Sequence, residues 1–243
     1  MNIETKYIRR ELSAVIEEAY RYFSVITITG PRQSGKTTLI RNLFPHLPYY
    51  SLENLDVRSF AENDPIAFLN QHVKGMILDE VHNAPNLLSY IQGMVDEDAD
   101  RRFILSGSSQ FAMLKKVSQS LAGRTAVFEL LPLSYSEVRE TVTDTPLDHL
   151  LFNGFYPAIY SGRNVPKFLY PAYMKTYLDK DVRDLLQIKD MMQFHMFIRL
   201  CAGRVGSLFK ASELANEIGI SSHTVTAWLS VLQASYIVTL LPP

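Results

Sequence analysis

The sequence is poor in cysteine and in long apolar runs, and each shortage excludes a class of protein. A single cysteine, Cys201, excludes a disulfide framework within the chain. Its stretch, FIRLCAGRV, contains no histidine or second cysteine, so we expect a buried structural thiol. No run approaches the roughly 18 apolar residues of a membrane helix, and the charged start MNIETKYIRREL lacks the apolar core of a secretory signal. We therefore expect a cytoplasmic protein with no membrane partner.

An excess of charge of either sign is also missing. The 24 basic and 25 acidic residues give a formal net charge of -1. No overall field therefore draws the protein to nucleic acid or to an anionic membrane, and such binding would need a local basic patch. The chain does have a 47% hydrophobic composition, which is enough to form a core and excludes intrinsic disorder.

Short β-branched runs alternate with helical patterns in the first half of the chain. This alternation predicts an α/β fold, in which helices cover a parallel sheet. The expected strands span residues 24–29, 48–53, 76–80, 103–107 and 125–131. Between them, Asp64 and Pro65 begin one helical pattern, and APNLLSYIQGMVDE carries apolar residues at helical spacing.

Helical periodicity replaces the strand pattern after Pro132. Near the end, Gly219 stands where one helix should stop, Ser221 or Ser222 can cap the next, and the pair is typical of a helix-turn-helix. The chain then stops at LLPP after an apolar strand-like run, so we expect this last domain to be truncated. The expected parts are a helical lead-in (1–23), a sheet-containing core (24–132), a helical lid (133–206) and a winged-helix-like domain (207–243).

The stretch GPRQSGKTT, residues 30–38, fits the spacing G-x-x-x-x-G-K-[ST] between a predicted strand and a predicted helix. Its glycines let successive backbone N–H groups turn inward and form an anion site at a helix N-terminus. Lys36 would neutralise the β and γ phosphates, and Thr37 would place its hydroxyl on Mg²⁺. A glycine-rich turn with a surface lysine is the alternative. The expected nucleotide-binding residues are Gly30, Pro31, Arg32, Gln33, Ser34, Gly35, Lys36, Thr37 and Thr38.

Two carboxylates end the apolar run GMILDEVH. A parallel sheet presents the ends of its strands at one edge, so we expect Asp79 and Glu80 beside the phosphate loop. Asp79 would join Thr37 in holding Mg²⁺, and Glu80 would orient or deprotonate the attacking water. Two acids after a strand are also common as helix N-caps. His82 is expected to be a structural loop residue.

Two further segments offer residues that could sense the γ-phosphate. FILSGSSQF ends in small polar residues, and Ser108 or Ser109 would face the phosphate unless the segment is an ordinary turn. Arg124 stands at the head of the last strand, where it could reach its own γ-phosphate or a neighbour's nucleotide, or lie in a surface turn. Arg183 is a weaker candidate for the same role. The expected catalytic residues are Glu80, Arg124 and Ser108.

Five motifs together carry a family resemblance. GPRQSGKTTL, MILDEVH, FILSGSSQF, LAGRTAVFELLPLSYSEV and ELANEIGISSHTVTAWLSVLQASYIVTLLPP closely resemble, in order and spacing, a widespread group of prokaryotic AAA-like P-loop ATPases. In that group an ATPase domain and a winged helix precede a C-terminal domain of unknown function. The resemblance implies a P-loop NTPase sheet with an extra strand between the loop strand and the carboxylate strand, followed by a helical lid and a winged helix. It also implies ATP and Mg²⁺ as ligands.

The chain departs from the group in two places. The expected C-terminal domain is absent, so we expect any activity housed there to lie outside this polypeptide. A turn usually written with two glycines reads NGFYP at residues 153–157, which leaves its role open. A homo-oligomer and the missing domain are both candidate partners.

The helix-turn-helix region argues against strong DNA binding. Residues 207–243 contain one basic residue, Lys210, against Glu213 and Glu217, whereas phosphate contacts supply most of the affinity for DNA. Packing between domains is therefore favoured over DNA readout. The leading hypothesis is an Mg²⁺-dependent ATPase that acts as a switch, and the alternative is an ATP-gated DNA-binding or regulatory module with little turnover. A small-molecule kinase fits less well, because the helical region lacks an arginine cluster for a second phosphate.

Overall fold

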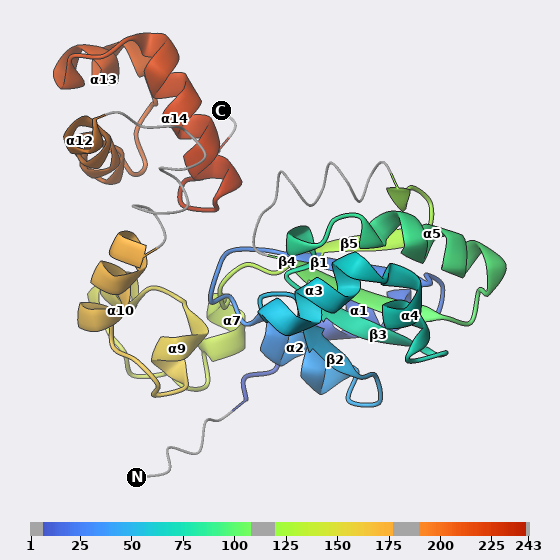
Figure 1. Ribbon diagram of the computed structural model, residues 1–243. Helices are drawn as coiled ribbons and strands as arrows, with labels where there is room; N and C mark the ends of the chain where they lie inside the picture. The colour runs from blue at the N-terminus through green and yellow to red at the C-terminus, as the bar shows by residue number, and fades with distance from the viewer. Residues whose placement is uncertain (1–6, 108–119, 177–189, 242–243) are drawn as a thin grey trace. The chain divides into compact units, whose positions relative to one another are not determined.

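The computed structural model describes residues 7–107, 120–176 and 190–241 (Figure 1). The chain divides into two compact units, Met1–Pro166 and Lys167–Pro243. Within the described residues, no helix is both long and apolar enough to cross a membrane.

The first unit is built on a five-stranded sheet in which all paired strands are parallel. The strand order is β2-β3-β4-β1-β5, so β2 lies outside the carboxylate strand and β4 separates that strand from β1. The predicted α/β fold with a parallel sheet is confirmed. The strands, labelled in Figure 1, are β1 (Val25–Thr29), β2 (Tyr49–Ser51), β3 (Gly75–Asp79), β4 (Arg102–Gly107) and β5 (Thr125–Glu129).

Helices cover both faces of this sheet, because its central strands are apolar on both sides. One core cluster joins α3, α4 and α5 to the sheet through residues such as Phe68 and Ile91, and the other joins α1 and α2 through Ile16 and Leu39. All five residues of β1 are buried. The helices are α1 (Leu12–Ala19), α2 (Lys36–Leu43), α3 (Leu55–Asn63), α4 (Pro65–Asn70) and α5 (Leu87–Glu97), with a short 3₁₀ turn η1 (Val81–Asn83).

Three short helices complete the first unit after the sheet. They are α7 (Tyr135–Val138), α8 (Leu147–Asn153) and α9 (Pro157–Tyr160). Leu133, Val138 and Leu150 form a small core there, against which Ile8 of the N-terminal segment packs. The compact unit continues to Pro166, and the expected start of a helical lid near residue 133 stays a prediction.

The second unit is helical where it is described. Trp228 packs against Phe194 and Phe197, with ring centroids 5.2 and 5.6 Å apart. Gly219 ends one helix in a left-handed conformation, φ 80°, and the Ser221 hydroxyl caps the next by accepting from the Thr224 N–H at 3.0 Å, as predicted. The helices are α10 (Pro166–Tyr173), α12 (Met191–Ala202), α13 (Ala211–Ile218) and α14 (Ser222–Ala234).

The strand-like run after α14 does not form a strand in the described part of the chain. Between residues 190 and 241 the regular elements are helices, and residues 235–241 follow α14 without strand pairing. An apolar, β-branched run forms a strand only when a second strand supplies hydrogen bonds, and a lone wing strand has no such partner. The helix-turn-helix is therefore present and the wing is not shown.

Candidate functional site

The phosphate loop connects β1 to α2 at the carboxyl edge of the sheet. Gly30 has φ 142°, and a Cβ placed on it would lie 2.2 Å from the Leu130 carbonyl oxygen. Gly35 caps α2 at φ 95°, and Gln33 is also left-handed at φ 64°. These angles turn the backbone tightly around the N-terminus of an eight-residue helix, the arrangement that binds anions through backbone N–H groups.

Lys36 lies over this loop with its side chain buried. Its Nζ donates hydrogen bonds to the carbonyl oxygens of Gly30, at 2.9 Å, and Pro31, at 2.8 Å. Burial lowers the pKa of Lys36, and the neighbouring carboxylates of Glu80 and Asp79 oppose that shift. The ammonium group is therefore held at the loop, where a phosphate would pair with it.

Asp79 ends β3 and is 5% exposed. Its Oδ2 accepts hydrogen bonds from Thr37 Oγ1, at 2.7 Å, and from the Tyr49 hydroxyl, at 2.8 Å. Its Oδ1 accepts from the Ser106 hydroxyl and from the Glu80 N–H. Burial, together with the hydrogen bond to Asp79, raises the pKa of Tyr49, so this phenol remains a donor. Three hydroxyl groups thus fix the carboxylate beside the loop.

Thr37 and Asp79 fit Mg²⁺ better than a softer metal. Both offer oxygen atoms, and Mg²⁺ is commonly held by one or two protein oxygens together with waters and substrate phosphates. The described residues contain no group of three or more histidine, cysteine or acidic side chains that could hold a metal ion. The donor set therefore matches a metal that arrives with a nucleotide.

Glu80 follows directly in a left-handed conformation, with φ 54° and ψ 46°. This conformation is uncommon for a residue with a side chain, and it clusters at functional sites. Glu80 Oε2 lies 3.1 Å from His82 Nδ1, and Glu80 is the strongest of the charges that raise the pKa of Lys36. Its carboxylate therefore lies near the loop lysine, and His82, expected only as a loop residue, is its partner.

Two site residues were not among those expected from the sequence. Ser106 lies on β4, where Leu105 pairs with Leu78, so the serine is level with Asp79. The one sequence feature that could have indicated Ser106 is a polar residue inside an otherwise apolar strand. Tyr49 comes from β2, whose Ser51 pairs with Asp79, and no sequence pattern marks it. Ser108, Ser109 and Arg183, which were expected as sensors, lie outside the described residues.

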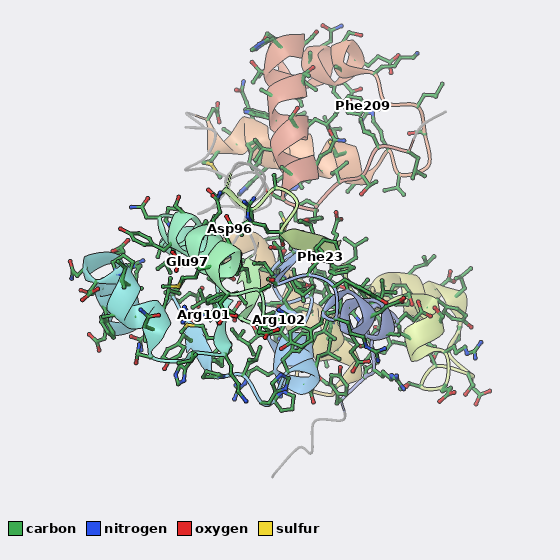
Figure 2. The ribbon with its side chains drawn as sticks, turned by 90° about the vertical axis from the view of Figure 1, so that its right-hand side faces the viewer. Phe23, Asp96, Glu97, Arg101, Arg102 and Phe209 are labelled. Atoms are coloured by element: carbon green, nitrogen blue, oxygen red, sulfur yellow. The ribbon has the colours of Figure 1, made fainter. Side chains whose placement is uncertain are left out.

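Arg124 lies at the opposite edge of the sheet from the phosphate loop. It directly precedes Thr125, which pairs with Val25 at the start of β1, whereas Gly30 follows the end of β1. Its Nη2 donates to Asp96 Oδ2 at 2.8 Å, and this hydrogen bond lowers the pKa of Asp96. In Figure 2, Asp96 is labelled near this edge of the sheet. The expected contact between Arg124 and the chain's own γ-phosphate is therefore wrong, because the length of β1 separates Arg124 from the phosphate loop. A contact with a nucleotide on a neighbouring chain stays a prediction.

Comparison with known proteins agrees with this geometry. Residues 22–139 match an AAA domain family, and residues 144–243 match a domain of unknown function (DUF8612). An uncharacterized protein of Mycobacterium tuberculosis, Rv2008c, is 29% identical over 242 residues, which are 97% of this chain and 53% of that protein. The uncharacterized protein MJ1544 of Methanocaldococcus jannaschii is 22% identical over 88% of this chain and 55% of its own length. The chain thus spans about half the length of these relatives.

A solved structure shares the fold. The Walker-type ATPase PABY2304 of Pyrococcus abyssi superposes with a TM-score of 0.55 at 14% identity, covering 94% of this chain and 90% of that one. At this identity the likeness shows the fold alone. Together with the matched families, it means that this chain carries a P-loop AAA domain over residues 22–139, followed by a region of unknown function.

Proposed function

We propose that the chain binds ATP with Mg²⁺ at residues 30–38 and hydrolyses it, acting as a nucleotide-driven switch. One observation carries the proposal. The Thr37 hydroxyl at the start of α2 donates to the Asp79 carboxylate at the end of β3, at 2.7 Å. This contact joins the loop that would hold phosphate to the acid that would hold the metal, with buried Lys36 in the same site.

Each residue then has a defined task. The loop amides and Lys36 bind the phosphates, while Thr37 and Asp79 hold Mg²⁺, which neutralises phosphate charge when bound. Glu80 orients a water and accepts its proton as that water attacks the γ-phosphorus. ATP is favoured over GTP by the family and because the sequence lacks an N-K-x-D-like guanine motif. The product ADP no longer presents a γ-phosphate to Lys36, and this difference drives the switch.

Phosphate release from Mg-ATP tests the proposal when it is measured per chain across a series of protein concentrations. Glu80→Gln should bind ATP like the wild type and lose turnover, on the order of 100-fold or more. Lys36→Ala should lose binding. If Glu80→Gln hydrolysed ATP at the normal rate, the catalytic assignment would be wrong.

The concentration series also tests Arg124. At the far edge of the sheet, Arg124 could reach only a phosphate held by a neighbouring chain, and the alternative is a surface arginine paired with Asp96. Activity per chain that rises steeply with concentration, and falls in Arg124→Ala, would support a site shared between subunits of a homo-oligomer. Activity that is flat with concentration would remove Arg124 from the catalytic residues.

An ATP-gated DNA-binding or regulatory module with little turnover is the second candidate. It is favoured by the helix-turn-helix of α13 and α14, whose cap at Ser221 and stop at Gly219 are well formed. It is opposed by the composition of α14, SHTVTAWLSVLQA, which offers no lysine or arginine to DNA phosphates. Fluorescence anisotropy with duplex DNA separates the two candidates: salt-sensitive micromolar binding that changes with ATP would favour the module.

A further inference from the structure

Arg10 is a buried arginine in the N-terminal segment that precedes α1. It is 7% exposed, whereas Arg9 beside it is exposed. A guanidinium is almost never buried unless it is paired and hydrogen-bonded. Arg10 also lies outside the residues 22–139 that match the AAA domain. Its hydrogen-bond partners, by contrast, all lie within those residues.

One side of this guanidinium contacts the phosphate loop. Nη1 donates to the Ser34 carbonyl oxygen at 2.8 Å, two residues before Lys36. The same atom lies 3.8 Å from the position that a Cβ on Gly35 would take. Arg10 thus holds the last turn of the loop, directly before the helix whose N-terminus would face the phosphates.

The other side contacts the chain as it leaves the sheet. Nη2 donates to the carbonyl oxygens of Leu131, at 2.6 Å, and Pro132, at 3.1 Å. Nε forms an ion pair with Glu137 Oε1 at 3.0 Å, and the Glu137 side chain is 5% exposed. Glu137 also accepts from the Ser134 N–H, which closes the capping box of α7. Arg10 is therefore bonded to the start of the helical region as well as to the loop.

A second connection returns from the same region to the loop. The Leu133 N–H donates to the Phe155 carbonyl oxygen at 2.8 Å, within the NGFYP turn. Pro157, the last residue of that turn, places Cγ 3.6 Å from the Cβ position of Gly35. Pro157 therefore lies close to the phosphate loop, and Arg10 is bonded both to the loop and to residues 131–137.

We propose that Arg10 is a positioning residue that makes the phosphate loop and residues 131–137 respond together to nucleotide. This inference rests on the function proposed above. A planar guanidinium with donors in fixed directions joins two backbone segments more stiffly than a flexible lysine. When phosphate orders the loop, the Ser34 carbonyl is held in place, and Arg10 transmits that restraint to Leu131, Pro132 and α7. The N-terminal segment is then part of the nucleotide site.

Two variants separate the effect of the Arg10 hydrogen bonds from the effect of losing its ion pair with Glu137. In Glu137→Gln the ion pair with Nε is lost, but one side-chain oxygen can still accept from the Ser134 N–H. Arg10 Nη1 and Nη2 can still donate to the loop and to residues 131–132. Arg10→Met in that same background removes those contacts without leaving a buried, unpaired carboxylate. Arg9→Ala, one residue away and exposed, is the matched control for loss of charge. Thermal unfolding of all three checks that they are folded.

Amide hydrogen exchange of the nucleotide-free protein is the first measurement. In Arg10→Met/Glu137→Gln, exchange in residues 32–36 and in residues 130–134 should both be about tenfold faster than in Glu137→Gln, because both segments lose the same anchor. Arg9→Ala should match the wild type. Equal exchange in the double variant and in Glu137→Gln would overturn the link, whether or not the protein binds ATP.

Nucleotide binding is the second measurement. Mg-ATP should protect both segments in Glu137→Gln. In the double variant it should protect the loop as before but residues 130–134 less, since Leu130 and Leu133 keep their backbone hydrogen bonds to Thr29 and Phe155. The Kd and KM for ATP should rise about tenfold while kcat changes little. Equal protection of residues 130–134 in the two variants would refute the coupling. A wild type that binds no ATP would refute the proposed function instead, and the nucleotide-free exchange would still report on the link.

Discussion

Three hydroxyl groups donate to Asp79, and each comes from a different element. Thr37 is the second residue of α2, Tyr49 begins β2, and Ser106 lies near the end of β4. A ligand carboxylate is usually oriented by hydrogen bonds of this kind, and their loss weakens metal binding. The phenol of Tyr49 can be removed without touching the phosphate loop.

We expect Tyr49→Phe to raise the Mg²⁺ concentration needed for half-maximal ATPase activity by on the order of 10-fold. The carboxylate would keep two of its hydroxyl donors, so activity should return at high Mg²⁺. Tyr50→Phe is the matched control, because that phenol contacts His72 Nε2 at 2.8 Å, away from the metal site. Identical Mg²⁺ dependence in the two variants would show that Tyr49 does not orient Asp79.

The buried charge of Lys36 is unfavourable for folding when no phosphate is bound. Burial lowers its pKa despite the attraction of Glu80 and Asp79, so the charged form is less favourable in the folded protein than in the unfolded chain. Burial of the charged ammonium therefore lowers the free energy of unfolding at pH values below the folded-state pKa of Lys36. This destabilisation disappears as the pH rises to the unfolded-state pKa.

We therefore expect Lys36→Met, without nucleotide at neutral pH, to have a Tm equal to or above that of the wild type while losing ATP binding. Lys74→Met, at an exposed position, is the control for removal of a lysine. Thermal unfolding and a fluorescent-nucleotide titration give the two readings. A Tm several degrees below that of the wild type would mean that the hydrogen bonds to Gly30 and Pro31 outweigh the burial of charge.

Sequence spacing predicted which loop residues and which strand-ending acids would form the site, because a phosphate loop depends on local order along the chain. The loop, Thr37 and Asp79 are brought together as expected. Ser106 and Tyr49 could not be predicted, because their place beside Asp79 depends on the order and register of strands far apart in sequence. Arg124 was correctly expected at the start of β5. Because β5 runs parallel to β1, that start lies at the edge of the sheet opposite the phosphate loop.

At the scale of elements, the end of β1 is packed against the end of β5. Leu130 N–H donates to the Thr29 carbonyl oxygen at 2.8 Å, and Gly30 passes directly over Leu130. The phosphate loop is therefore built on two neighbouring strands, and the glycine is required by close approach as well as by its backbone angle.

Gly30→Ala should lower the free energy of unfolding by on the order of 3 kcal/mol, the range expected when strain and overpacking combine. Gly123→Ala is the matched control: Gly123 also has a positive φ, 76°, but no described heavy atom lies within 4 Å of its Cβ position. It should cost only about 1 kcal/mol of conformational strain. Urea unfolding of both variants measures the difference, and equal losses would mean that the loop can shift away from Leu130.

Elements were predicted well where local chemistry determines them and less well where a partner is needed. The five strands agree with the sequence patterns to within about two residues, the usual uncertainty of element ends. Asp64 caps α4, accepting from the Ala67 N–H at 3.0 Å. The wing after α14 is not shown in the described residues, because an isolated apolar run cannot indicate whether a pairing strand exists. α10 continues through Pro171 to Tyr173.

At the scale of the whole molecule, the chain contains two compact units, and the proposed switch reaches the second only if that unit responds to nucleotide bound by the first. The chain has one tryptophan, and Trp228 lies in the second unit, 7% exposed. It packs against Phe194 and Phe197 of α12. Tryptophan emission therefore reports on the packing of the second unit without any added label.

We expect Mg-ATP to change the emission of Trp228 in Glu80→Gln, where ATP is bound but not hydrolysed, and ADP to give a smaller change. The reason is that a nucleotide can shift an equilibrium only by its differential affinity for the two states. Lys36→Ala, which should not bind ATP, is the control for absorption of light by the nucleotide. Saturating ATP with unchanged emission would confine the switch to the first unit.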